Sequence, residues 1–230
     1  MAIPETLYHY TPYMGTLCSI LESGFWPKYS KENIEWLEFH GNKEIGLPGD
    51  KELGLPMVCF CDIPFQQIES HIRIFGYYGF GMSRIWAERN EISPVHYIRH
   101  YGVVANLYQD LKVNAKEELK RLTAYTQNYD YISESEWRYV PNIQGVPGYV
   151  IDRTLYDNQR MEYFNQITRD KAMLKFAPVD VKYIIVKFNR DVAPLCHWIQ
   201  RRFTPNVAQL LMPKIITCEN YFIVSNTHVT

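Results

Sequence analysis

The segment VKYIIVKF, residues 181–188, carries the strongest strand signal in the sequence, because β-branched and aromatic residues dominate it. Apolar periodicity predicts further strands in four shorter segments: LYHY at 7–10, MVCFCD at 57–62, and KIITC and YFIVS near the C-terminus. Apolar residues at three- and four-residue steps predict helices at 11–23 and 64–75. Neither repeats nor low-complexity linkers interrupt the chain, so we expect one α+β domain over residues 1–230.

Two long stretches outside these segments give different signals. Residues 45–56, IGLPGDKELGLP, are rich in glycine and proline and predict a loop. Residues 103–126 predict the longest helix, with leucines on its inner face and charged residues on its outer face.

Composition excludes several classes of protein. The net charge is -1, so the chain has no excess of positive charge that would favour non-specific binding to nucleic acid or to an anionic membrane. The sequence contains no apolar run of about 18 residues, and its start, MAIPETLYHY, lacks the features of a secretory signal. Five cysteines, an odd number, are typical of reduced thiols. We therefore expect a cytoplasmic protein without membrane association.

Cys59 and Cys61 form a C-x-C pair, which raises the question of a metal site. A structural zinc site needs four ligands, usually as two spaced pairs, and the sequence has no second pair. Free cysteines are among the most buried residues, so we interpret this pair as core packing and expect no metal. The sequence also lacks a Walker loop and a G-x-S-x-G elbow.

The segment YISESEWRYV, residues 131–140, places two carboxylates one residue apart. On a strand, Glu134, Glu136 and Arg138 would share one face, because side chains alternate with period two. Two neighbouring carboxylates repel, so at least one should resist ionisation. Two interpretations stay open: a solvated edge on which Arg138 relieves the repulsion, or a site that needs both carboxylates.

Several motifs in order resemble a known family. LYHYT, ILESGFWPKYS, LPMVCFCDIP, FGYYGFGMSRIWA, SPVHYI and ESEWRYVP together resemble the AbiGi family of abortive phage resistance proteins, which carries an antitoxin label. More distantly, the order H-Y-T, Y-S, E-x-E resembles ADP-ribosyltransferases, including the DarT-like enzymes that modify DNA. This resemblance implies a split β-sheet core with flanking helices and NAD as a substrate.

The distant resemblance also implies roles for residues. His9, with Tyr10 and Thr11 beside it, would bind the ribose of NAD, and Tyr29 or Ser30 would contact the nicotinamide ribose. Glu136 would hold the 2′-hydroxyl, and Glu134 would orient or deprotonate the acceptor. Cleavage of the bond to nicotinamide builds positive charge on the sugar, which a carboxylate on that hydroxyl stabilises. The acceptor class, whether protein, DNA or RNA, stays open.

Three functional hypotheses follow. The first is an NAD-dependent ADP-ribosyltransferase or NAD glycohydrolase in anti-phage defence, with His9, Tyr29 and Glu136 in one cleft. The second is an antitoxin-like partner of a toxin encoded beside it, with Glu134 and Glu136 exposed at the surface. The third is an interaction protein without a ligand. The sequence lacks the Ser-Thr-Ser signature of many transferases, which weighs against the first hypothesis.

Overall fold

The computed structural model describes residues 5–33, 52–99, 103–104, 122–151, 154 and 156–222. The chain forms two compact units. The first comprises Met1–Gly24, Phe60–Arg89 and Lys175–Thr230, and the second comprises Phe25–Cys59 and Asn90–Leu174. Helices and strands occur in both units, which confirms the α+β class. The single-domain organisation stays a prediction. None of the described helices is long and apolar enough to span a membrane.

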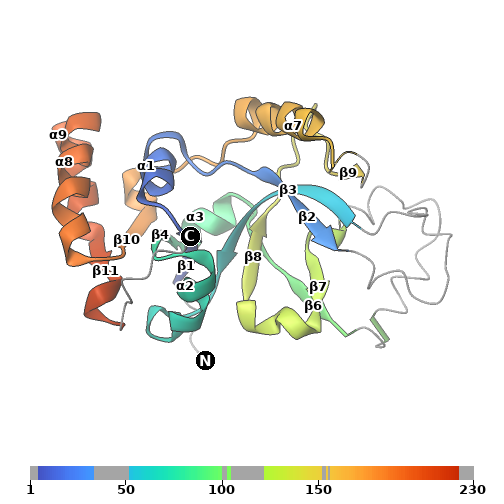
Figure 1. The fold of residues 1–230 in the computed structure, drawn as a ribbon, viewed down its shortest axis with the longest axis horizontal. Helices are drawn as coiled ribbons and strands as arrows, with labels where there is room; N and C mark the ends of the chain where they lie inside the picture. Colours follow the sequence, from blue (N-terminus) through green and yellow to red (C-terminus); the bar gives the residue numbers. More distant parts are fainter. Residues whose placement is uncertain are drawn as a thin grey trace. The chain divides into compact units, whose positions relative to one another are not determined.

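The first unit contains a mixed sheet whose strands come from distant parts of the chain (Figure 1). Strand β4 (Tyr78–Ser83) is antiparallel to both β1 (Thr6–Thr11) and β10 (Val181–Val186), while β11 (Ile215–Thr217) runs parallel to β10. These positions confirm the strands predicted at 7–10, 181–188 and KIITC. The strand predicted for YFIVS lies largely outside the described residues.

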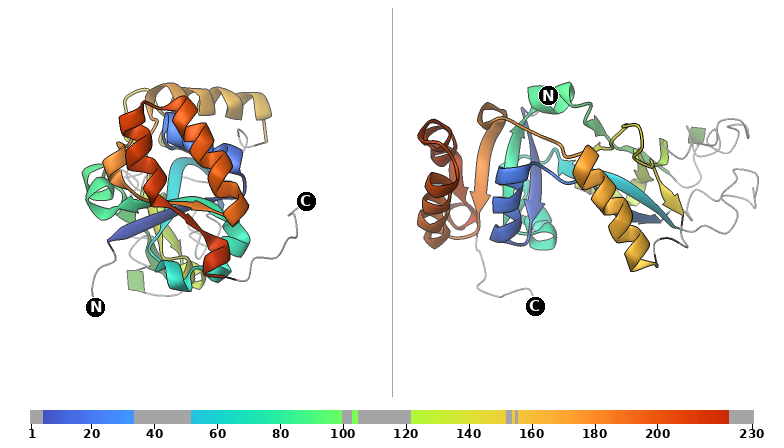
Figure 2. Two further views of the ribbon diagram at one scale, coloured as in Figure 1. Left: turned by 90° about the vertical axis from the view of Figure 1, so that its left-hand side faces the viewer. Right: turned by 90° about the horizontal axis from the view of Figure 1, so that it is seen from above.

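The helices of the first unit bury apolar faces, as their sequence periodicity predicts. Helix α1 (Met14–Ser23) buries Leu17, Ile20 and Leu21 and ends at Gly24, which has a positive φ of 86°. The predicted helix at 64–75 is a short 3-10 helix, η4 (Phe65–Gln67), followed by α2 (Glu69–Phe75). Helices α8 (Val192–Arg202) and α9 (Pro205–Leu211) lie side by side (Figure 2). The remaining helical segments are α3 (Arg84–Arg89), η7 (Pro178–Asp180), η8 (Asn189–Asp191), η9 (Met212–Lys214) and η10 (Cys218–Asn220).

The second unit is built on strand β3 (Glu52–Cys61), whose last two residues belong to the first unit. Strand β3 pairs antiparallel with β2 (Lys28–Asn33) and with β9 (Val150–Ile151). Leu53, Leu55 and Met57 pack with Ala124 in its core. The other elements among the described residues of this unit are β5 (Ser93–Pro94), β6 (His96–Ile98), β7 (Thr126–Asn128), η6 (Tyr129–Glu134), β8 (Glu136–Tyr139) and α7 (Asn158–Lys171).

The loop predicted for residues 45–56 is wrong for its last five residues. Gly54 and Pro56 lie inside β3, where Pro56 is the register partner of Tyr29. Leu53 and Leu55 alternate with them and are fully buried, so apolar burial outweighs the weak strand propensity of glycine and proline. The long helix predicted at 103–126 lies largely outside the described residues, and Thr126 begins β7.

Candidate functional site

The strand predicted over residues 131–140 exists only in its second half. Helix η6 runs through Glu134, and its first turn is capped by Asn128, whose side chain accepts a hydrogen bond from the backbone N–H of Asp130. Ser135 then adopts a left-handed conformation with φ 45°, and β8 begins at Glu136. The prediction that Glu134 lies on the strand is therefore wrong, whereas Glu136 and Arg138 do share one face of β8.

Arg138 lies between two carboxylates in the interior of the second unit. Its side chain is 2% exposed, and its Nη2 is 2.8 Å from Oε2 of Glu136 and 3.4 Å from Oε2 of Glu32. Its Nη1 donates a hydrogen bond of 2.9 Å to the carbonyl oxygen of Ala124. Glu136 is 9% exposed, so this ion pair is buried and not a solvated edge contact. The guanidinium fixes the position of both carboxylates.

Two carboxyl groups around Arg138, those of Glu32 and Glu134, have raised pKa values. Burial raises the pKa of Glu32 and Glu136 raises it further, although Arg138 lowers it. Burial also raises the pKa of Glu134, with a second contribution from Glu136. Burial would lower the pKa of Arg138, but Glu136 and Glu32 raise it above its ordinary value. One guanidinium thus faces three acidic groups, and the pKa values of Glu32 and Glu134 are raised, mainly by burial and further by Glu136.

Cys59 adds a thiol to the carboxylates. It is exposed to solvent, yet enough protein surrounds it that loss of hydration raises its pKa well above the ordinary value. A hydrogen bond with Glu136 raises that pKa further. The core-packing interpretation of the C-x-C pair is correct for Cys61, which is buried, and wrong for Cys59. Within the described residues, no group of three or more metal-binding side chains is arranged to hold a metal ion.

Two uncharged side chains complete the surroundings of the ion pair. Tyr97, on β6, accepts a hydrogen bond of 2.7 Å from the backbone N–H of Glu136, and burial raises its pKa to about 12. Gln127, on β7, donates a hydrogen bond of 3.3 Å to Oε2 of Glu32. These contacts connect four strands, β2, β6, β7 and β8. The group of side chains around Arg138 is called the charged cluster below, and its members are Glu32, Cys59, Tyr97, Glu134, Glu136 and Arg138.

Tyr29 and Ser30 occupy opposite faces of β2. Tyr29 is buried, its hydroxyl donates to the carbonyl oxygen of Pro147, and its ring packs against Phe164 of α7. Burial raises its pKa. Ser30 is exposed, and because side chains alternate along a strand it shares a face with Glu32. Of these two predicted residues, Ser30 therefore lies on the face that carries the charged cluster.

His9, Tyr10 and Thr11 belong to β1 in the first unit. The half-buried His9 ring packs against Phe60, with ring centroids 5.6 Å apart. Tyr10 is buried in an apolar cluster, stacks on Tyr8, and has a pKa raised mainly by burial. Thr11 is buried at the end of the strand. Glu134 and Glu136 lie in the second unit, so a cleft shared with His9 stays a prediction.

Sequence reasoning missed Glu32, Cys59 and Tyr97 as members of the charged cluster. Cys59 follows Met57 in the period-two alternation of β3, and Glu32 follows Ser30 in that of β2. This alternation was the only signal in the sequence, and it places Glu32 on the same face of β2 as Ser30, and Cys59 on the same face of β3 as Met57. It gives no information about which strands become neighbours.

Comparisons with known proteins agree on one family. A family model described as "Putative abortive phage resistance protein AbiGi, antitoxin" matches residues 24–187. A protein from Lactococcus lactis subsp. cremoris, "Abortive phage resistance protein AbiGi", is 25% identical over 223 residues, which covers 77% of this chain and 88% of the relative. No solved structure matches this chain significantly.

Proposed function

Because the chain belongs to the AbiGi family of abortive phage resistance proteins, we propose that it acts in anti-phage defence as an NAD-consuming enzyme, either an ADP-ribosyltransferase or an NAD glycohydrolase. The observation that supports this activity is the Glu136 carboxylate, which Arg138 holds at 2.8 Å beside a second carboxyl group, Glu134. A carboxylate that is positioned before substrate binds needs no reorganisation during the reaction.

The residues of the cluster suit the ribose of NAD as a substrate. Glu136 accepts a hydrogen bond from the 2′-hydroxyl, and Ser30, on the face of β2 that carries Glu32, binds the same sugar. The bond from ribose C1′ to the nicotinamide nitrogen breaks, and the electron pair leaves with nicotinamide. Positive charge then develops on the sugar and strengthens its interaction with Glu136, so the carboxylate stabilises the transition state more than the ground state.

Glu134 serves as the general base in this scheme. Water, or a hydroxyl or amine of an acceptor, forms the new bond to C1′ and passes its proton to Glu134. The raised pKa of Glu134 brings it closer to neutrality, where a carboxylate is a more effective base. Arg138 is a positioning residue, because it acts through Glu136 and Glu32.

Release of nicotinamide from NAD tests the proposal. The full chain is incubated with NAD alone and with protein, DNA or RNA acceptors, and nicotinamide is quantified by chromatography. We expect Glu136→Gln to lower the rate by roughly 10²- to 10³-fold, the effect of removing one preorganised electrostatic contact. Glu162→Gln, an exposed position on α7, is the matched control. Full activity in Glu136→Gln would exclude Glu136 as the catalytic carboxylate.

An antitoxin-like partner is the second candidate function, and the word "antitoxin" in the family description supports it. In that case the protein releases no nicotinamide with any acceptor and forms a stoichiometric complex with the product of a neighbouring gene. Size-exclusion chromatography of the co-expressed pair measures this complex. Release of nicotinamide by the isolated chain would favour the enzyme instead.

A further inference from the structure

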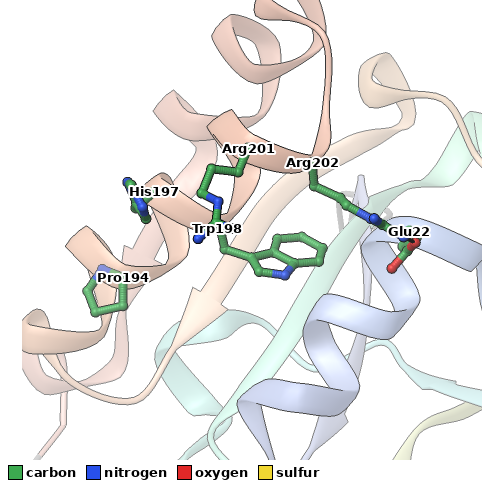
Figure 3. A pocket seen from close by; sticks show the side chains of 6 residues that line it. All are labelled: Glu22, Pro194, His197, Trp198, Arg201 and Arg202. Atoms are coloured by element: carbon green, nitrogen blue, oxygen red, sulfur yellow. Dashed lines mark hydrogen bonds and ion pairs between the residues drawn. The ribbon is translucent and has the colours of Figure 1, made fainter.

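A pocket of about 380 Å³ lies beside helix α8 in the first unit, and none of the residues assigned a role above lines it. Its lining residues are Glu22 of α1 and Pro194, His197, Trp198, Arg201 and Arg202 of α8 (Figure 3). The residues of α8 follow the spacing i, i+3, i+4, i+7 and i+8, so they form one face of the helix. The volume is within the range of small-molecule sites.

One wall of the pocket is closed by an ion pair within the unit. Arg202 Nη2 contacts Oε1 of Glu22, so the charge of this arginine is already matched. Arg201, the preceding residue, is exposed and has no carboxylate within ion-pair distance in the part of the chain that the structure describes. The pocket therefore presents one guanidinium, that of Arg201, which forms no ion pair with any carboxylate of the described residues.

Trp198 differs from two other tryptophans of the chain. The indole N–H of Trp26 donates to the carbonyl oxygen of Asn165, and that of Trp86 donates to the carbonyl oxygen of Lys175. For Trp198, no described residue accepts a hydrogen bond from the indole N–H. The ring is half-buried, packs edge-on with Phe203 and lines the pocket. An aromatic ring with an available donor thus lies next to an unmatched guanidinium.

We propose that this pocket binds a nucleoside phosphate, with the base stacked on Trp198 and the phosphate bound by Arg201 and His197. Aromatic side chains stack on every base because each base has a π-face, and a guanidinium matches the geometry of phosphate oxygens. His197 is exposed and lies one helical turn before Arg201, so both reach the same side of the pocket. The proposal is independent of the enzymatic activity proposed above.

The same ligand chemistry has two sources, a free nucleotide or a nucleotide within a single strand. Arg201 also has a role that needs no ligand, because a cation in the last turn offsets the negative end of the helix dipole. A binding experiment must therefore separate three cases: a free nucleotide, a single strand, and no ligand.

The test measures fluorescence anisotropy of a labelled 12-nucleotide oligothymidylate and competition by unlabelled AMP and by inorganic phosphate. We expect Arg201→Gln and Trp198→Leu each to weaken binding about tenfold, as the loss of a stacking or phosphate contact does. Arg73→Gln removes an exposed arginine of α2 that is paired with Glu69, and should leave affinity unchanged. Glu162→Gln, at an exposed position of α7 outside both proposed sites, should also bind like the unmodified chain.

Each outcome supports or overturns the proposal. If AMP displaces the labelled oligonucleotide and binds with a similar affinity, the ligand of the pocket is a free nucleotide. If the oligonucleotide binds and AMP does not displace it, the ligand is a single strand. Phosphate that competes as well as AMP, or affinity that neither pocket variant changes, overturns it. Arg201 is exposed, so Arg201→Gln should fold normally, and a thermal melt of Trp198→Leu checks the half-buried position.

Discussion

At the scale of single residues, Arg138 decides how the charged cluster is built. Two carboxylates accept its hydrogen bonds inside the second unit, where a lone charge is costly. A buried ion pair adds little net stability compared with apolar residues of the same volume, but removal of one partner leaves the other uncompensated. The sequence placed Arg138 and Glu136 on one face correctly, although it could not show that both are buried.

Arg138→Met tests this argument. Without the guanidinium, Glu136 and Glu32 stay buried without a cation, so we expect the free energy of unfolding to fall by about 3–5 kcal/mol. Urea unfolding followed by circular dichroism measures it. Arg160→Met, which removes an exposed arginine paired with Asp157, should cost less than about 1 kcal/mol. Equal losses in the two variants would show that Glu136 and Glu32 need no buried cation.

The raised pKa of Glu32 predicts a dependence of stability on pH. The folded chain binds the Glu32 proton more tightly than the unfolded chain, in which the pKa of Glu32 has its ordinary value of 4.5. The free energy of unfolding therefore falls as pH rises from 4.5 through the pKa of Glu32 in the folded chain. Glu32→Gln should therefore be at least as stable as the unmodified chain at pH 7, with the difference vanishing below pH 4.5. Thermal melts across this range measure it, with Glu162→Gln as the exposed control.

The opposite result would also be informative. A Glu32→Gln variant that is less stable at pH 7, and recovers as pH falls, would mean that attraction to Arg138 outweighs burial and lowers the pKa of Glu32.

At the scale of elements, apolar periodicity predicted β1, β10 and β11 of the first unit, whose apolar residues, such as Leu7 and Ile184, are buried, but it did not predict β4. The failures have local causes. Pro56 and Gly54 indicated a loop, but pairing of β3 with β2 holds them in a strand. Ser135 adopts a left-handed conformation, which ends η6 immediately before β8 and which periodicity does not report. The backbone conformation of single residues therefore limits how accurately the ends of strands and helices can be predicted from apolar periodicity.

Two glycines allow a matched test of backbone conformation. Gly76, which ends α2, has φ +116°, and a Cβ there would lie 2.3 Å from the backbone carbon and oxygen of Thr11. Gly15, in the first turn of α1, has no atom within 4 Å of its Cβ position. We expect Gly76→Ala to destabilise the protein by more than about 2 kcal/mol and Gly15→Ala to stabilise it by about 0.5–1 kcal/mol. Thermal melts of both variants measure these opposite signs, and a stable Gly76→Ala would contradict them.

At the scale of the whole molecule, the charged cluster depends on which strands become neighbours. Glu32, Cys59, Tyr97 and Arg138 are widely separated in the sequence, and each lies on a different strand of the second unit. A single sequence predicts which face of its own strand each residue occupies, but not the pairing that brings the faces together. The E-x-E motif was visible because its two members are local, whereas the residues that position it are not.

Protection of cells against phage tests the function of the whole chain. Because the proposed reaction requires the Glu136 carboxylate, we expect cells that carry Glu136→Gln to lose protection in a plating assay, while cells that carry Glu162→Gln keep it. Immunoblots of both variants must show equal protein levels, since removal of one partner of a buried ion pair can lower abundance. If Glu136→Gln still protects, and protection instead requires a neighbouring gene, the antitoxin function explains the family better than catalysis does. Loss of protection together with loss of nicotinamide release would connect the carboxylate, the reaction and the defence.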